Sequence, residues 1–161
     1  MSTSLASSLG LAKIASTDTI REVLRTQISS TARPALHRSS FEPAGGSAKE
    51  DWKETVQALS GGVLAVIERA ISRGTDLLLE GVHYLPNKEV IDLWREAGGV
   101  AIGVVLYVSS EERHRGMIAN REKHNGKKVD HYLGNLDRIR EIQEELVLSG
   151  SEFGWLVIDP T

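Results

Sequence analysis

The residues best placed for chemistry lie in the segment Ile14–Arg25, which reads IASTDTIREVLR. A short apolar run ends there in hydroxyl residues, and Asp18 is followed three positions later by Arg21. In a helix, that spacing puts the carboxylate and the guanidinium on the same side of the first turn. The carboxylate can hold or deprotonate a substrate hydroxyl, and the arginine can bind a phosphate or carboxylate. The structural alternative is an aspartate that caps the helix beside an arginine in solvent.

Two other segments carry groups that bind anions or metals. His37–Ser40 (HRSS) places an imidazole, a guanidinium and two hydroxyls in consecutive residues. This mixture suits an anionic ligand, although a polar surface loop has the same composition. Glu80 and His83 follow a leucine run at the carboxyl end of a predicted strand. A carboxylate there is costly to bury unless it meets a metal, a cation or a ligand, or turns outward at the edge.

A highly charged helix is predicted over 111–124, with arginines at positions 113, 115 and 121. The pattern indicates either a solvated helix face or a mobile basic cover that closes over phosphates. In the second case, the arginines stabilise negative charge that develops during group transfer. No zinc site is predicted, because the histidines lack the spacing of metal ligands: His83, His114 and His131.

The elements that position these groups alternate along the chain. Apolar periodicity predicts helices over 2–10, 18–30, 50–73, 87–97, 111–124 and 132–148, and strands over 13–15, 76–80, 100–108 and 155–159. The strands over 76–80 and 100–108 are apolar runs, as in parallel sheets covered on both faces. The order predicts an α/β doubly wound fold. Lys127 and Lys128 are placed in a turn.

Helical spacing also predicts which residues face inward. They are Ile20, Val23, Leu24 and Ile28 in the helix over 18–30, and Val56, Leu59, Val63, Val66, Ile67 and Ala70 in the helix over 50–73. Thr19 and Glu22 are predicted to form a capping box.

Length and composition narrow the class of protein. With 161 residues, 40% of them hydrophobic, the chain suits a single domain over 1–161. A net charge of −3 gives no general attraction to nucleic acid or membrane. No apolar run reaches the roughly 18–20 residues that span a bilayer. The absence of cysteine excludes disulfides and thiolate metal sites. We expect a cytoplasmic protein, or an organellar one if a longer N-terminus precedes this sequence.

Four strings in the chain resemble, in order, the archaeal-type 2-phosphoglycerate kinase family and related plant P-loop proteins linked to phytate synthesis. They are STDTIREVLR, PALHRSSFE, LLLEGVHYLP and YLGNLDRIREIQEEL. The resemblance implies a P-loop NTPase-like fold, a three-layer parallel sheet flanked by helices. It also implies transfer of the terminal phosphoryl group of ATP to the hydroxyl of 2-phosphoglycerate. ATP and Mg²⁺ are then the cofactors, and the partner is a small phosphorylated hydroxy acid or polyol.

The same resemblance implies roles for individual residues. The implied catalytic residues are Asp18, Glu80 and Arg121, the last in a lid over about 111–131. The implied substrate-binding residues are Arg21, His37, Arg38, Ser39, Ser40 and His83. Ser2, Thr3 and Asp159 are implied at the nucleotide, and Ser2 and Glu80 as Mg²⁺ ligands. These acidic and basic groups are expected to converge on one cleft.

The chain departs from the family pattern in two places. A P-loop reads G-x-x-x-x-G-K-[ST], and its backbone amides and lysine hold the phosphates. Ser2 and Thr3 match the residues after that lysine, Met1 takes the lysine's place, and the glycine loop and first strand are missing from the sequence. Loss of that strand is expected to expose the edges and apolar faces of its neighbours. In the lid, Met117 stands where an arginine is expected.

Three hypotheses therefore stay open. The chain is an impaired ATP- and Mg²⁺-dependent kinase domain, an inactive module that binds phosphorylated metabolites, or a fragment of an active enzyme. A P-loop encoded in frame upstream of Met1 favours the fragment, whereas a stop codon there favours the inactive module.

Overall fold

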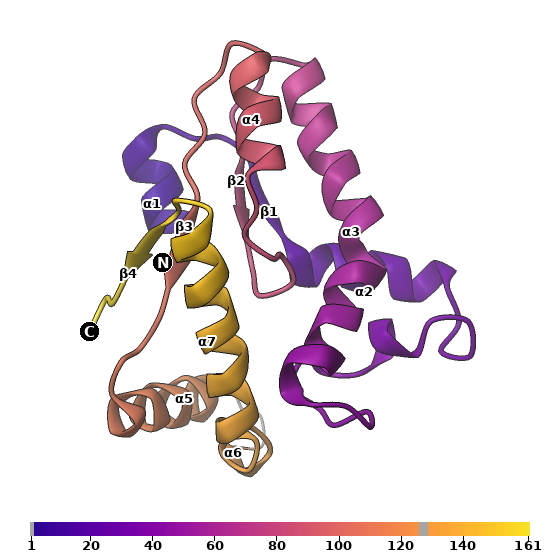
Figure 1. Ribbon diagram of the computed structural model, residues 1–161, viewed down its shortest axis with the longest axis vertical. Coiled ribbons are helices and arrows are strands. Elements are labelled where there is room, and N and C mark those ends of the chain that lie inside the picture. Colours follow the sequence, from indigo (N-terminus) through magenta and orange to yellow (C-terminus); the bar gives the residue numbers. More distant parts are fainter. Residues whose placement is uncertain (1, 126–128) are drawn as a thin grey trace. The chain divides into compact units, whose positions relative to one another are not determined.

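The computed structural model describes residues 2–125 and 129–161. Helices alternate with short parallel strands (Figure 1), which confirms the predicted α/β class. The chain divides into a first unit, the residues up to Ser40 with Glu50–Leu85, and a second unit, Phe41–Lys49 with Pro86–Thr161. A single domain over 1–161 and a lid over about 111–131 stay predictions. The turn predicted at Lys127 and Lys128 lies outside the described residues.

The first unit contains one pair of parallel strands. Its elements are α1 (Ser2–Leu9), β1 (Ile14–Ser16), α2 (Thr17–Gln27), the 3₁₀ helix η1 (Pro34–His37), most of α3 (Ala48–Ser72) and β2 (Leu78–Glu80). Strands β1 and β2 lie side by side in Figure 1, and Ser16 is the register partner of Glu80. The carboxyl ends of both strands therefore meet at the start of α2.

Helix α3 supplies most of the first unit's core. Buried residues recur along it at intervals of three or four positions, as an amphipathic helix requires: Trp52, Thr55, Leu59, Val63, Ile67 and Ala70. The inward positions predicted from Leu59 onward are largely confirmed, whereas Val56 and Val66 are only half-buried. Trp52 and Thr55 belong to the same stripe, but apolar spacing did not predict them, because both side chains carry a polar group.

Helix α2 meets α3 closely at Gly62. A Cβ placed at Gly62 of α3 would lie 2.9 Å from Cγ2 of Ile20, one of the predicted inward residues. Two predictions for this helix are wrong. Val23 is exposed, because it falls outside the narrow face that meets α3. The capping box of Thr19 and Glu22 does not form, because the helix begins earlier, with Ser16 at the N-cap and no side-chain capping bond.

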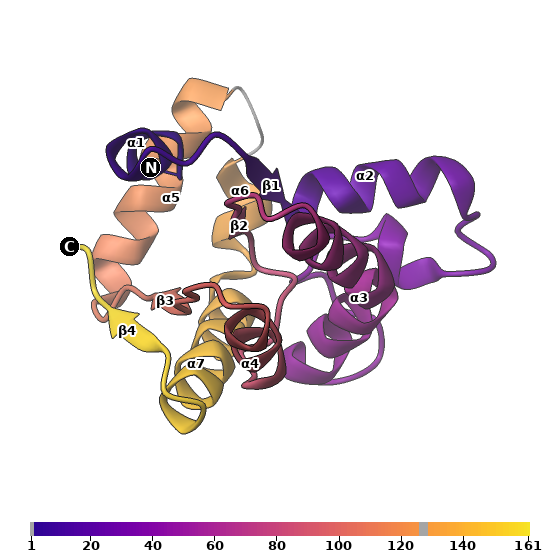
Figure 2. The same ribbon diagram turned by 90° about the horizontal axis from the view of Figure 1, so that it is seen from above.

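The second unit contains the other strand pair. Its elements are α4 (Glu89–Glu96), β3 (Val104–Leu106), α5 (Glu111–Asn125), α6 (Val129–Leu133), α7 (Leu136–Glu152) and β4 (Leu156–Ile158). Strands β3 and β4 are parallel, with Val105 opposite Val157. Both valines face Gly150 of α7, which covers this side of the pair (Figure 2).

Two sequence predictions for the second unit need correction. The strand over 100–108 is not buried on both faces, because α7 covers only one face. The aliphatic side chains on the other face are exposed: Val104, Leu106, Leu156 and Ile158. The helix predicted over 132–148 is interrupted after Gly134, where the N–H of Asn135 leaves the α-helical pattern and bonds the carbonyl of Tyr132, three residues back, at 3.1 Å. Helix α6 ends at this turn and α7 begins just after it.

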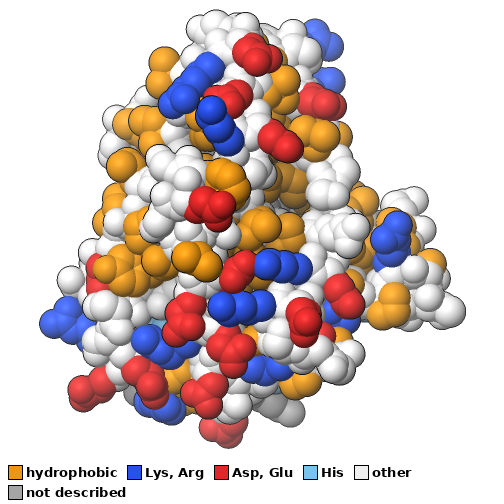
Figure 3. Space-filling model, viewed as in Figure 1, with side chains coloured by type: hydrophobic (Ala, Val, Ile, Leu, Met, Phe, Trp, Pro, Cys, Tyr) orange, Lys and Arg blue, Asp and Glu red, His pale blue; other side chains and the backbone are white. Residues whose placement is uncertain are grey.

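Acidic and basic side chains are mixed on the lower left of Figure 3, where Figure 1 shows α5. Within that helix, Arg115 pairs with Glu111 at 3.2 Å, one turn away. Such pairing fits a solvated helix face as well as it fits a basic cover. In the part of the chain that the structure describes, no helix is both long and apolar enough to cross a membrane.

Candidate functional site

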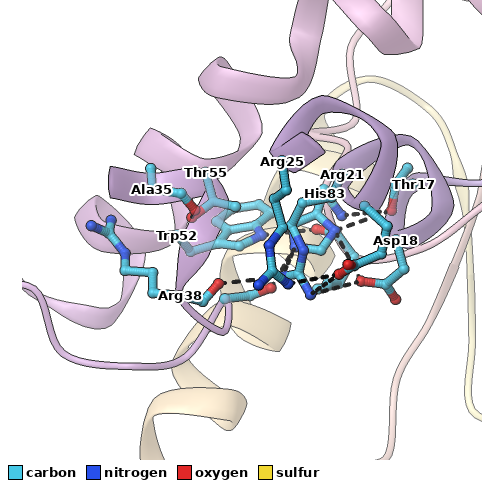
Figure 4. A network of polar contacts seen from close by, with 12 residues as sticks. Thr17, Asp18, Arg21, Arg25, Ala35, Arg38, Trp52, Thr55 and His83 are labelled. Carbon is cyan, nitrogen blue, oxygen red and sulfur yellow. Dashed lines mark hydrogen bonds and ion pairs between the residues drawn. The ribbon is translucent and has the colours of Figure 1, made fainter. Parts of the chain in front are cut away.

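The candidate site lies in the first unit, at the start of α2 and the carboxyl ends of β1 and β2. Figure 4 shows a network of polar side chains gathered there around His83. Ligands of open α/β sheets bind at this end of the strands. Glu80 ends β2 opposite Ser16, and Thr17 and Asp18 follow directly in the chain. The three segments of this unit predicted to carry functional groups, Ile14–Arg25, His37–Ser40 and Glu80–His83, all contribute to this region.

Asp18 and Arg21 lie on the same side of α2, as their spacing predicts. Asp18 Oδ1 lies 3.6 Å from Arg21 Nη2. The Asp18 side chain is 62% exposed, whereas that of Arg21 is only 16% exposed. Arg21 Nη1 donates to the backbone carbonyl of Arg38 at 3.3 Å. Its Nε is buried and has no hydrogen-bond partner within the described chain.

His83 sits at the centre of the network, with a side chain that is 0% exposed. Its Nδ1 lies 3.2 Å from Thr17 Oγ1, and its Nε2 lies 2.6 Å from Ser40 Oγ. Arg21 Nη1 is 3.4 Å from Nε2. Burial lowers the pKa of His83 from 6.5 to about 4, with nearby Arg21 acting in the same direction and Asp18 opposing it. The imidazole is therefore neutral near pH 7.

The turn after β2 brings His83 into this position. Gly81 has φ +131°, and a Cβ there would collide with the Thr17 hydroxyl. Trp52 Nε1 donates to the carbonyl of Val82 at 2.8 Å and holds the turn from α3. Thr17 is fully buried in this network, although it was not among the residues predicted from the sequence. Its position directly before Asp18, at the end of a predicted strand, is the sequence feature that could have indicated a role in the site.

The segment His37–Ser40 contributes unequally to the site. Ser40 is buried against His83, as described above, and Ser39 is half-buried. His37 Nε2 donates to the carbonyl of Ile28 at 2.8 Å. The Arg38 guanidinium bonds the carbonyl of Asp51 at 2.7 Å and Glu54 Oε2 at 2.8 Å. In Figure 4, it points away from His83, so Arg38 reaches Arg21 through its carbonyl alone.

The remaining predicted residues belong to α1 and to the second unit. Ser2 and Thr3 begin α1. In the second unit, the Arg121 guanidinium carbon lies 5.2 Å from the centre of the Tyr132 ring. Asp159 accepts hydrogen bonds from Ser109 and Thr161, and these bonds hold its pKa well below the usual range. The expected convergence of Arg121 with the groups of the first unit stays a prediction.

The fit to ATP and Mg²⁺ is partial. The sequence contains no G-x-x-x-x-G-K-[ST] segment, so these residues do not supply a phosphate nest with its lysine. Among the described residues, no three or more histidine, aspartate or glutamate side chains gather as metal ligands. Mg²⁺ in phosphotransferases needs only one or two carboxylates beside phosphate oxygens and water. Glu80 is half-buried at the end of β2 and fits that smaller requirement.

Comparison with curated proteins shows which enzymes the chain is similar to. The chain is 30% identical to the 2-phosphoglycerate kinase of Pyrococcus furiosus over 99% of its length and 31% identical to that of Thermococcus kodakarensis over the same share. The enzyme of Methanococcus vannielii is 33% identical over 92% of the chain. The chain is a homologue of the 2-phosphoglycerate kinases.

This homology explains the order of the four strings and agrees with the P-loop kinase-like α/β arrangement. The chain spans about half the length of the 2-phosphoglycerate kinases it matches, with 54%, 56% and 51% of the three enzymes covered. No protein-family model matches the chain, and no solved structure matches it.

Proposed function

We propose that the chain is part of an ATP- and Mg²⁺-dependent phosphotransferase whose acceptor is a small phosphorylated hydroxy acid such as 2-phosphoglycerate. The names of its homologues support a kinase-like function. The observation that carries the proposal is the pairing of an exposed carboxylate with a largely buried guanidinium at the carboxyl ends of β1 and β2. That arrangement suits a ligand with both a hydroxyl and an anionic group.

In this proposal, Arg21 binds an anionic group of the acceptor. Arg38 and His83 already hold its guanidinium, so little side-chain entropy is lost on binding. Asp18 is exposed and orients the acceptor hydroxyl, from which it takes the proton. Glu80 is the proposed Mg²⁺ ligand, and the metal supplies charge stabilisation for the transferred phosphoryl group.

Two neighbouring arginines of α2 test the proposal. Arg25 lies on the same helix, is exposed and pairs with Glu22 at 2.8 Å, so Arg25→Ala is a matched control for Arg21→Ala. We expect Arg21→Ala to raise the Kd for 2-phosphoglycerate at least about tenfold by calorimetry, because a charge-assisted contact is lost. Arg25→Ala should leave the Kd within about twofold. Equal effects of the two variants would contradict the proposed site.

A second candidate function is a catalytically inactive module that binds phosphoglycerate-like anions. The observation that favours it is that the Arg38 carbonyl and His83 already hold the Arg21 guanidinium, an arrangement that needs no nucleotide to bind an anion. A coupled assay for ADP formation, run on a version of the chain restored with an upstream P-loop, separates the two functions. Binding with turnover supports the kinase, and binding without turnover supports the module.

A further inference from the structure

His83 cannot bind the acceptor directly in this structure, because its side chain has no exposed surface. Its contacts nevertheless join three segments of the chain that are far apart in sequence, its own included. Thr17 and Arg21 come from α2, Ser40 from the loop after η1, and His83 itself from the turn after β2. The ring therefore joins groups that the proposed function uses, without touching the ligand.

The contacts of the ring determine which nitrogen carries the proton. Arginine can only donate hydrogen bonds, and Arg21 Nη1 faces Nε2. Nε2 therefore holds the lone pair, which also accepts the shorter bond from the Ser40 hydroxyl. The proton lies on Nδ1 and is donated to Thr17 Oγ1, which also accepts the backbone N–H of His83 at 3.4 Å. Both ring nitrogens are satisfied in this tautomer.

We propose that His83 is a positioning residue: as the neutral Nδ1–H tautomer anchored on Thr17, it holds the Ser40 hydroxyl and the Arg21 guanidinium in place for an anionic acceptor. The role of the acceptor rests on the proposed function. The tautomer and the ordering of Arg21 do not depend on it.

An alternative chemistry is a catalytic triad, in which Ser40 is the nucleophile, His83 the base and Asp18 the carboxylate that orients the base. The geometry and electrostatics oppose it. Asp18 Oδ1 is 3.7 Å from Nδ1, too far for a good hydrogen bond. Burial keeps the pKa of His83 near 4. Asp18 raises this pKa and Arg21 lowers it, and both face the ring from α2. An imidazole with so low a pKa is a weak base toward a serine hydroxyl.

Substitution of His83 by glutamine or by asparagine tests the contacts of the two ring nitrogens one at a time. In His83→Gln, the amide oxygen reaches the position of Nε2 and can still accept from Ser40 and Arg21. In His83→Asn, the shorter amide reaches only the position of Nδ1 and keeps the contact with Thr17. We expect the Kd for 2-phosphoglycerate to stay within about threefold in His83→Gln and to rise about tenfold or more in His83→Asn. Calorimetry is done where circular dichroism shows both variants folded. Equal Kd values, which a purely structural role produces, would overturn the proposal.

Two measurements decide the proposal without a ligand. Nitrogen NMR of the imidazole at pH 7 should show a protonated Nδ1 and an unprotonated Nε2, and the reverse tautomer would overturn the proposal. The Arg21 Nε–H signal should persist in His83→Gln and broaden in His83→Asn. If these results hold and the unmodified chain binds no 2-phosphoglycerate, the proposed function fails and the positioning role stands. Labelling of Ser40 by a fluorophosphonate would support the nucleophile instead and overturn the proposal.

Discussion

At the start of α2, two side chains of opposite charge sit in different environments. The Arg21 guanidinium is largely buried and held by the Arg38 carbonyl and His83, whereas the Asp18 carboxylate is exposed. A fixed cation favours selective binding of one anionic group, and an exposed carboxylate can move to meet a hydroxyl. Sequence spacing predicted the pair, but the difference in burial comes from the packing around His83.

The lowered pKa of His83 has a consequence for stability. Above pH 6.5, the ring is neutral in both the folded and the unfolded chain. As the pH falls from 6.5 to about 4, the unfolded chain binds a proton that the folded chain excludes, so the free energy of unfolding decreases. The loss across that window is about 3 kcal/mol.

Urea denaturation at several pH values between 4 and 7.5 measures this effect. His83→Gln lacks the titrating ring and serves as the control. Its stability should fall less steeply with decreasing pH than that of the unmodified chain. Identical pH profiles would show that His83 is not the group responsible.

Among the elements, the turn after β2 matters most for the site. It carries the chain from Glu80 to His83 against the start of α2, and Gly81 makes the close approach to Thr17 possible. The elements themselves follow the predicted order, with strand ends shorter than the apolar runs suggest. The strands are short because only part of each run pairs with a neighbouring strand.

A pair of glycine substitutions tests the turn. Gly81→Ala adds a Cβ that meets the Thr17 hydroxyl and strains a backbone at φ +131°, so we expect a loss of about 3 kcal/mol in unfolding free energy. Gly74→Ala is the control, because its φ of +56° is also positive but the space around it is open. That variant should lose about 1 kcal/mol. Similar midpoints in urea for both variants would contradict the close approach.

At the scale of the whole molecule, the residues proposed to bind the acceptor and the segment that binds nucleotide phosphates in P-loop kinases differ in whether this sequence contains them. The proposed acceptor groups lie within the first unit. The glycine loop and lysine that hold nucleotide phosphates have no counterpart in the sequence. We therefore expect these residues to bind the acceptor better than the nucleotide.

We accordingly expect residues 1–161 to bind ATP weakly. The missing lysine and amide nest remove phosphate contacts worth several kcal/mol, on the order of a thousandfold or more in affinity. Calorimetry with ATP and Mg²⁺ measures this, and 2-phosphoglycerate titrated into the same sample serves as the control. A micromolar Kd for ATP would contradict the expectation.

The sequence by itself determined the alternation of helices and strands, the pairing of Asp18 with Arg21 and the likeness to the 2-phosphoglycerate kinases. These features depend on local periodicity, on spacing within one helical turn and on the order of the four strings. Only the tertiary structure decided that His83 is buried at the centre of a polar network. It meets Thr17 across 66 positions of sequence and Ser40 across 43, and no local pattern encodes such contacts. The tertiary structure also decided that one face of β3 and β4 is exposed, because burial depends on which elements cover a strand as well as on its own residues.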